Sequence, residues 1–219
     1  GFDFYSAHIN LSVSPALENV IIGDYLVRGG QGLVVWQGFS TGKSVSAMNI
    51  SKTNQGIRPY TSTNENRFFR GVAVALRKKR TRVNIFYSRK NIDANIIYPD
   101  SASCYFTSLQ SSGYHRTINE IKDEKSVKDI NAGFTSSWNF KNLQLGATFL
   151  LRIFNIPYRP APQLYNYFRF RGKKNIAAGF DYRLNRKKFQ FIGEAAISKS
   201  KGKAFIQGII ANLHDQLHV

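Results

Sequence analysis

The chain has 219 residues, and 42% of them are hydrophobic, which is enough to bury a core and excludes wholesale disorder. Lys and Arg number 31 against 13 Asp and Glu, and the net charge of +18 favours anionic partners, either nucleic acid or acidic lipid. The only cysteine, Cys104, excludes an intramolecular disulfide framework and a multi-cysteine zinc site. The mean hydropathy of -0.30 and the lack of a long apolar run exclude transmembrane helices. Membrane-spanning β-strands stay open, because they are apolar only at alternate residues.

Period-two alternation predicts nine β-strands along the chain. They cover residues 3–13, 20–28, 70–78, 83–96, 131–140, 143–152, 176–184, 189–198 and 204–213, and the last letters, LHV, look like the start of a tenth. Strands of about ten residues are long enough to cross a bilayer at a tilt.

Each predicted strand has one apolar and one polar face. In residues 131–140, Phe134 and Trp138 alternate with Thr135, and Trp138 lies near the strand end, as aromatic residues do at a membrane interface. The polar faces together supply the candidate lining of a lumen: Asn84, Thr135, Gln144, Thr148, Arg152, Asp181, Arg183, Gln190 and Glu194.

The connections between strands alternate between short turns and long loops. Short turns at one end and long loops at the other are typical of an up-and-down barrel that crosses an outer membrane, with the long loops outside the cell. We therefore expect an all-β, antiparallel transmembrane β-barrel in which residues 1–219 are part of a single domain. Residues 29–69 would form a long lumen or extracellular loop, and 98–130 a long extracellular loop. The alternative is a soluble β-sandwich, which also alternates but needs no such rhythm of connections.

One short surface helix is predicted within YHRTINEIKDEKSVKDI (114–130), with Ile118, Ile121 and Val127 on one face. His115 lies in sequence near Glu120 and Asp123, a grouping that could begin a metal or hydrolase site. No second histidine lies nearby and no G-x-S-x-G motif occurs, so we expect no catalytic, metal or cofactor site.

The letters Gly42-Lys43-Ser44 are those that end a P-loop, but the glycine that should open the loop is replaced by Gln37. No amphipathic helix follows, so nucleotide binding is not expected. The glycines of this region instead predict a segment that folds over or into the lumen as a constriction. Its candidate residues are Lys43, Arg58, Glu65, Arg67 and Arg70, which could select anions or simply pin the loop through pairs with carboxylates.

Aromatic residues alternate with cations in YNYFRFRGKK (165–174). Arg169, Arg171, Lys173 and Lys174 could meet lipopolysaccharide phosphates above the bilayer, or the aromatics and cations together could hold single-stranded nucleic acid. The strand predicted to follow favours the lipid interpretation.

Three segments are distinctive: GDYLVRGGQGLVVWQGFSTGKS (23–44), NQGIRPYTSTNENRFFRG (54–71) and GYHRTINEIKDEKS (113–126). They resemble the barrel region of large Bacteroidetes outer-membrane proteins that carry helix-hairpin-helix domains. The resemblance implies a location in the outer membrane of a Gram-negative bacterium, a barrel fold, and further parts at both ends of the chain. The DNA-binding helix-hairpin-helix segments of that family have no counterpart in this sequence.

These patterns favour a non-enzymatic outer-membrane barrel that acts as a conduit or as a component of an envelope assembly. Its expected partners are outer-membrane lipid and lipopolysaccharide, and other envelope proteins. Nucleic-acid binding or DNA uptake is the alternative function, and an outer-membrane hydrolase is a remote one.

Overall fold

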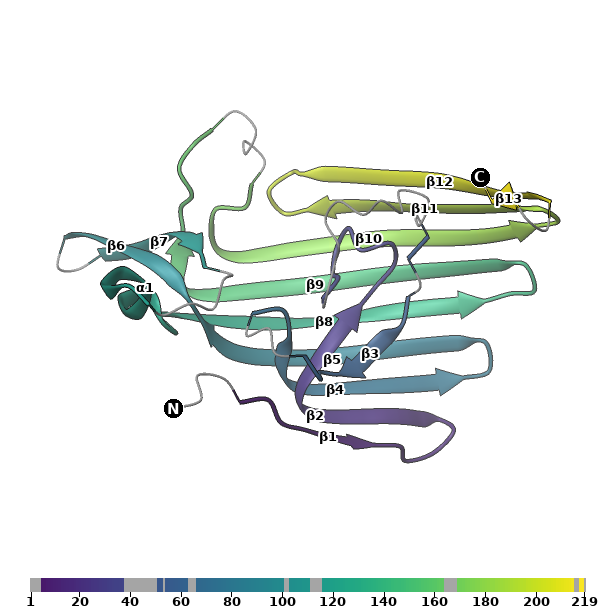
Figure 1. Cartoon of the computed structure of the whole chain (residues 1–219), viewed down its shortest axis with the longest axis horizontal. Coiled ribbons are helices and arrows are strands. Elements are labelled where there is room, and N and C mark those ends of the chain that lie inside the picture. Colours follow the sequence, from purple (N-terminus) through teal and green to yellow (C-terminus); the bar gives the residue numbers. More distant parts are fainter. Residues whose placement is uncertain are drawn as a thin grey trace.

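A computed structural model describes residues 5–37, 51–52, 54–62, 66–100, 103–110, 116–163, 169–214 and 217–218. They form one 13-stranded sheet whose strands lie side by side in Figure 1. Its main path is β1 (His8–Leu11), β2 (Leu17–Arg28), β4 (Phe69–Lys78), β5 (Thr81–Ile92), β8 (Val127–Asn139), β9 (Leu143–Tyr158), β10 (Gly172–Arg186), β11 (Phe189–Ser198), β12 (Lys203–His214) and β13 (Leu217–His218). Off this path lie β3 (Gly56–Pro59), β6 (Ala94–Asp100) and β7 (Ser103–Leu109), and one helix, α1 (Ile118–Asp123).

Neighbouring strands along the main path are antiparallel. The prediction of an all-β protein with up-and-down antiparallel strands and one short helix is therefore confirmed. The path ends at β1 on one side and β13 on the other, so the sheet is open among the described residues. Closure into a barrel and insertion in a membrane stay predictions.

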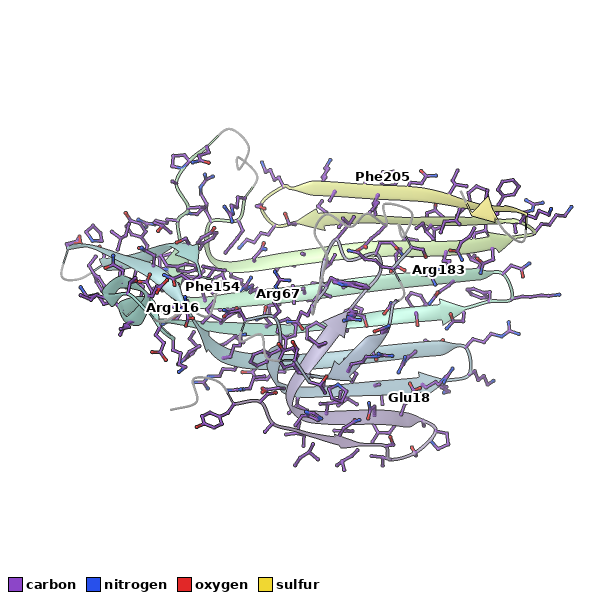
Figure 2. The ribbon with its side chains drawn as sticks, viewed as in Figure 1. Glu18, Arg67, Arg116, Phe154, Arg183 and Phe205 are labelled. Carbon is purple, nitrogen blue, oxygen red and sulfur yellow. The ribbon has the colours of Figure 1, made fainter. Side chains whose placement is uncertain are left out.

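The sheet has two chemically distinct faces, because directly paired residues point to the same side. The first, which we call the inner face, includes the paired row Ala75, Asn84, Thr135 and Thr148. The second, the outer face, exposes large apolar side chains on nearly every strand of the main path: Ile22, Val72, Leu76, Ile85, Tyr87, Phe134, Trp138, Phe180, Phe189, Ile197, Phe205 and Ile209. Phe205, at the β12 edge, is labelled in Figure 2 and is 68% exposed. Large apolar side chains are thus exposed on the outer face, whereas the inner face carries buried polar side chains such as Thr135, Asp181 and Glu194.

β2 changes direction at a pair of glycines. Gly23 and Gly71 are partners across β2 and β4, and their φ angles of 106° and 154° are unfavourable for residues with a side chain. A Cβ on Gly23 would also collide with the backbone of Ala7. Beyond this point β2 pairs with β3 as well as β4, and Figure 1 shows its end passing in front of the sheet.

The apolar core lies on the inner face around β2. It contains Ile21, Tyr25, Val27, Val35, Ile57, Phe69, Ala73, Ala75 and Phe86. Phe69 stacks on Phe86 with ring centroids 5.6 Å apart, and the Tyr25 hydroxyl donates to the Tyr87 carbonyl at 2.8 Å. This core fixes the end of β2 against the sheet.

A second apolar cluster lies at the end of the sheet where the long loops are. Phe106 on β7 packs against Phe154 and Tyr158 on β9, with ring centroids 5.0 and 4.8 Å apart. The β6–β7 hairpin and α1 lie at this end in Figure 1, as does the short connection between β11 and β12, whereas the turns that join β4 to β5, β8 to β9 and β10 to β11 lie at the opposite end. We call these the loop end and the turn end.

Three features of the sequence analysis need correction. The predicted strand 83–96 is divided at Asp93 into β5 and β6. The predicted helix region 114–130 yields a helix of only 6 residues, and Val127 is buried in β8 instead. The segments 29–69 and 98–130 contain strands, because β3 pairs with β2 and β6 pairs with β7.

Candidate functional site

Residues 29–37, 51–52 and 54–60, which we call the covering segment, lie against the polar side chains of the inner face. A Cβ on Gly29 would lie 2.7 Å from the Thr148 hydroxyl and 2.9 Å from a Thr135 methyl carbon. A Cβ on Gly56 would lie 2.8 Å from Asn84 Nδ2. The covering segment therefore crosses the middle of the sheet at backbone contact distance.

Glu194 holds the turn of the covering segment. This side chain on β11 is 2% exposed, and its Oε2 accepts hydrogen bonds from the backbone N–H groups of Gln31 at 2.6 Å and Leu33 at 3.1 Å. Gly30, which directly precedes Gln31, has a φ of 54°. A Cβ at this position would lie 2.8 Å from the same oxygen, Oε2 of Glu194. Hydrogen bonds from two backbone amides to an ionised carboxylate are charge-assisted, and they are stronger than hydrogen bonds between neutral groups.

Asp181 on β10 is the direct cross-strand partner of Glu194 and is also buried. Gly146 on β9 leaves room for the Asp181 carboxylate, since a Cβ there would collide with it. Arg183, two residues further along the inner face, donates to the carbonyl of Lys52 at 2.6 Å. Strand β11 thus holds the part around Gln31 and Leu33, and strand β10 holds the part around Lys52.

Trp36 packs against two cations, Arg28 at the end of β2 and Lys52 in the covering segment. The Arg28 guanidinium lies 5.4 Å and the Lys52 ammonium 4.9 Å from its ring centroid, which is cation–π geometry. Gln31 exchanges hydrogen bonds with the backbone of Lys52, at 2.9 Å as acceptor and 3.3 Å as donor. Arg28 also donates to the Gln55 side chain at 2.6 Å. These contacts join residues 28–37 to residues 51–55.

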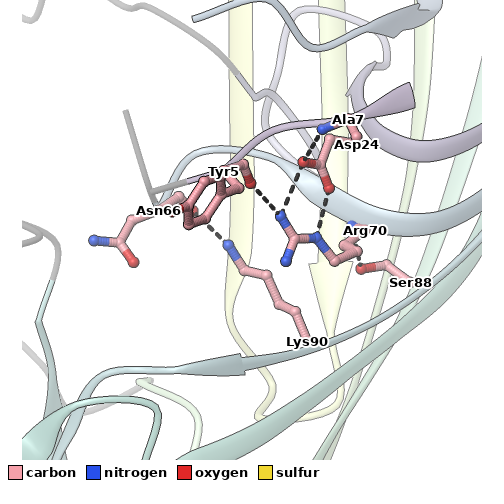
Figure 3. A network of polar contacts seen from close by, with 7 residues as sticks. All are labelled: Tyr5, Ala7, Asp24, Asn66, Arg70, Ser88 and Lys90. Atoms are coloured by element: carbon pink, nitrogen blue, oxygen red, sulfur yellow. Dashed lines mark hydrogen bonds and ion pairs between the residues drawn. The ribbon is translucent and has the colours of Figure 1, made fainter. Parts of the chain in front are cut away.

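A charged network, drawn in Figure 3, surrounds Arg70 at the start of β4. Arg70 donates to both carboxylate oxygens of Asp24, at 2.7 and 2.9 Å, and to the Tyr5 carbonyl at 2.9 Å. Asp24 is 1% exposed, so this bidentate pair supplies the charge partner that a buried carboxylate requires. Lys90 lies beside the network and donates to the Asn66 carbonyl at 3.2 Å. The network ties the N-terminal segment to β2, β4 and β5.

The candidate lumen residues all lie on the inner face, as the strand registers require. Asn84 donates to Thr135 at 2.8 Å, and Arg152 pairs with the buried Asp129 through two contacts of 2.9 Å. Gln144 lies toward the turn end, and Gln190 donates to Asn185 at 2.7 Å. The structure brings Thr135, Thr148, Asp181, Arg183 and Glu194 together beneath the covering segment.

The loop candidates are distributed differently from the prediction. Arg70 pairs with Asp24, whereas Glu65, the carboxylate expected for it, lies outside the described residues, as does Lys43. Arg58 is exposed on β3, and Arg67 is exposed beside Phe68. Gly42 and Ser44 also lie outside the described part of the chain.

The basic residues Arg169, Arg171, Lys173 and Lys174 are exposed at the start of β10. Arg169 lies over the Tyr158 ring at 5.8 Å, and Phe170 stacks against Phe154 and Tyr158 at 6.3 Å each. Phe170 is therefore part of the aromatic cluster at the loop end. Tyr165, Tyr167 and Phe168 lie outside the described residues.

The proposed histidine grouping is not brought together among the residues described. Glu120 serves the N-terminus of α1, Asp123 accepts from Gln110, and His115 lies outside the described ranges. Within those ranges no cluster of three or more His, Cys, Asp or Glu side chains could hold a metal ion. The same ranges contain no helix with the length and hydropathy of a membrane span.

Sequence reasoning missed Asp24, Asp129 and the backbone of residues 29–33 as parts of the site. The available signal was weak: Asp24 follows the apolar run VIIG in β2, and a carboxylate buried there needs a cation, whereas β8 around Asp129 is largely polar. Its partner is distant in sequence, 46 residues away for Asp24 and Arg70. Comparison with family models, curated proteins and solved structures finds no match for this chain.

Proposed function

We propose that the chain forms part of the wall of an outer-membrane β-barrel, a non-enzymatic protein that acts as a conduit or as a component of an envelope assembly. The inner face would line the lumen, and the covering segment would obstruct it. The outer face would contact lipid, and the basic residues Arg169, Arg171, Lys173 and Lys174 would meet lipopolysaccharide phosphates. The resemblance to Bacteroidetes outer-membrane proteins agrees with this location.

The distribution of side chains on the two faces supports the proposal most strongly. Ile85, Phe180 and Phe205 are each at least half exposed, whereas Thr135, Asp181 and Glu194 on the opposite face are buried. Water would favour the reverse arrangement, because exposed apolar surface costs about 25 cal/mol per Å². Hydrocarbon outside and polar groups inside is the arrangement of membrane barrels.

Two cavities on the inner face support a conduit rather than a solid scaffold. A cavity of about 570 Å³ lies toward the loop end and includes Trp36 and Arg152 in its lining. A second, of about 360 Å³, lies toward the turn end and includes Gly56, Arg80 and Gln144. The covering segment contributes residues to both and lies between them. An interrupted passage of this kind would conduct only after the covering segment moves.

Nucleic-acid binding is the second candidate, supported by the net charge of +18. Its weakness is that Phe170 packs into the aromatic cluster with Phe154 and Tyr158, so this ring is less available for stacking on bases. Affinity for single-stranded DNA that falls steeply with salt and with Lys173→Gln and Lys174→Gln substitutions would favour this candidate.

The barrel proposal is tested by fluorescence quenching in vesicles of brominated phosphatidylcholine. The chain has two tryptophans, Trp36 in the covering segment and Trp138 on the outer face. The Trp36→Phe variant reports only Trp138, and the Trp138→Phe variant reports only Trp36. We expect Trp138 to be quenched several-fold more strongly, because bromine on the acyl chains quenches only rings in contact with lipid.

The two variants act as matched controls for each other. Acyl chains brominated near the headgroup should quench Trp138 more than chains brominated near the methyl end, since Trp138 lies close to a turn. Equal quenching of the two tryptophans, or recovery of the protein from the soluble fraction without detergent, would contradict the proposal.

A further inference from the structure

The cavity at the loop end lies between the covering segment on one side and strands β5, β8 and β9 on the other, and it is partly open. Val34, Val35, Trp36 and Gln37 line it from the covering segment. Residues 66–69, at the start of β4, complete its wall. At about 570 Å³ it has the size of a small-molecule site.

Cations outnumber carboxylates in this cavity. Its lining contains Arg67, Lys90 and Arg152, but only Asp129 as a carboxylate. Asp129 is already neutralised by its bidentate pair with Arg152. The side chain of Arg67 makes no hydrogen bond or ion pair within the described part of the chain. Lys90 uses one N–H for the Asn66 carbonyl, which leaves two further donors.

Aromatic and aliphatic groups lie beside these cations. The Lys90 ammonium is 4.2 Å from the centroid of Phe68, which is 3% exposed, and Leu150 lines the cavity from β9. Asn131, 2% exposed, also contributes to the lining, and its Nδ2 has no hydrogen-bond partner among the described residues. A buried donor without a partner destabilises the protein, so a ligand acceptor there would be favourable.

We propose that this cavity binds a small amphipathic anion, a carboxylate or a phosphate monoester attached to an apolar body. The anionic group contacts Lys90 and Arg67, and the apolar body packs against Phe68, Val34 and Leu150. Charge and size select the ligand together: an anion alone leaves the apolar wall in contact with water, and an uncharged body leaves the two cations unpaired. As a site within a conduit this inference rests on the proposed function, whereas the binding itself does not.

Trp36 lines the cavity and so provides a direct probe of its occupancy. In the Trp138→Phe background, Trp36 is the only tryptophan, and nitroaromatic compounds quench its fluorescence on contact. The protein in detergent is titrated with 4-nitrophenyl phosphate, 4-nitrobenzoate, inorganic phosphate and uncharged 4-nitrobenzyl alcohol. We expect saturable quenching by one or both nitroaromatic anions and binding at least tenfold weaker for the alcohol. Which of the two anions binds more tightly distinguishes a phosphate from a carboxylate ligand, and inorganic phosphate should compete only weakly.

The variants Lys90→Gln and Arg67→Gln should each weaken the binding of the better anion by about tenfold, the effect expected for loss of a charged hydrogen-bond donor. Lys141→Gln removes an exposed cation in the β8–β9 turn, outside the cavity, and should leave the affinity unchanged. Because Arg67 is exposed, its substitution tests the site even if the Lys90 variant fails to fold. Equal affinity for the anions and the alcohol, or unchanged affinity in both cavity variants, would overturn the inference. If the anions bind but bromolipids do not quench Trp138, the binding site is supported and the barrel proposal is contradicted.

Discussion

Glu194 connects the sheet to the covering segment through the N–H groups of Gln31 and Leu33. The substitution Glu194→Ala would leave both amides buried without an acceptor, at a cost of about 1–3 kcal/mol in the free energy of unfolding. We expect amide hydrogen exchange at residues 29–35 to accelerate about tenfold or more while the strands retain their protection. Hydrogen exchange with residue resolution measures this change.

Gln190→Ala is a suitable control for this prediction, because Gln190 is on the same strand and face but bonds only to Asn185 among the described residues. Exchange at residues 29–35 should not change in the control. The same rate in both variants would show that Glu194 does not hold the covering segment.

Side-chain direction was predictable at the residue scale, but side-chain partners were not. Alternation alone assigns Thr135 and Thr148 to one face, because each strand has a period of two residues. It cannot reveal that Arg70 bonds to Asp24, since this pairing depends on the register between β2 and β4. Alternation likewise cannot explain Phe86 on the polar face, because its ring packs against Phe69 on β4 and lies over Gly133 on β8.

At the scale of elements, α1 depends on a capping box formed by Thr117 and Glu120. The N–H groups of Arg116 and Thr117 donate to the Glu120 carboxylate and lower its pKa. Because the pKa is lower in the folded state, this stabilisation is complete above the unfolded pKa and is lost as pH falls through the folded one. We expect exchange protection of residues 118–123 to decrease with acidification, and this decrease to be absent in Glu120→Gln.

Asp123, at the other end of α1, contributes with the opposite sign, since burial raises its pKa and outweighs the hydrogen bond from Gln110, which lowers it. This contribution is common to the native chain and the variant, so the difference between their pH profiles isolates Glu120. Identical profiles for the two proteins would refute the capping interpretation.

The long strands were predictable because their alternation continues for ten or more residues. The shorter ones were not. β3 has 4 residues and ends at Pro59, and β6 contains Pro99, so local signals indicate turns in both. They become strands because β2 and β7 lie alongside and supply the hydrogen-bonding partners. Val127 likewise belongs to β8 because Ile92 pairs with it, although the helical spacing of its neighbours suggested otherwise.

At the scale of the whole molecule, the covering segment should control conductance if the sheet closes as proposed. We expect the protein in planar bilayers to be nearly non-conducting. Replacing residues 30–60 with a short Gly-Ser linker should give a conductance at least tenfold larger, and the double variant Glu194→Gln with Arg183→Gln should open intermittently. The Gln190→Ala protein is the control and should stay closed. Equal conductance in all four proteins would contradict a role of this segment in obstruction.

The short turns and the cavity beside them concentrate positive charge. Arg77, Lys79, Arg80 and Arg82 all line the turn-end cavity, and its lining has no acidic residue. Glu18 pairs with Arg77 and Arg82 at 3.3 and 2.7 Å, whereas Lys79 and Arg80 have no carboxylate partner within the described part of the chain. An ion leaving through this mouth would therefore meet a different potential from one leaving through the other. If the sheet closes as proposed, this mouth would attract anions and repel cations, so a current through the pore would be carried by chloride in preference to sodium.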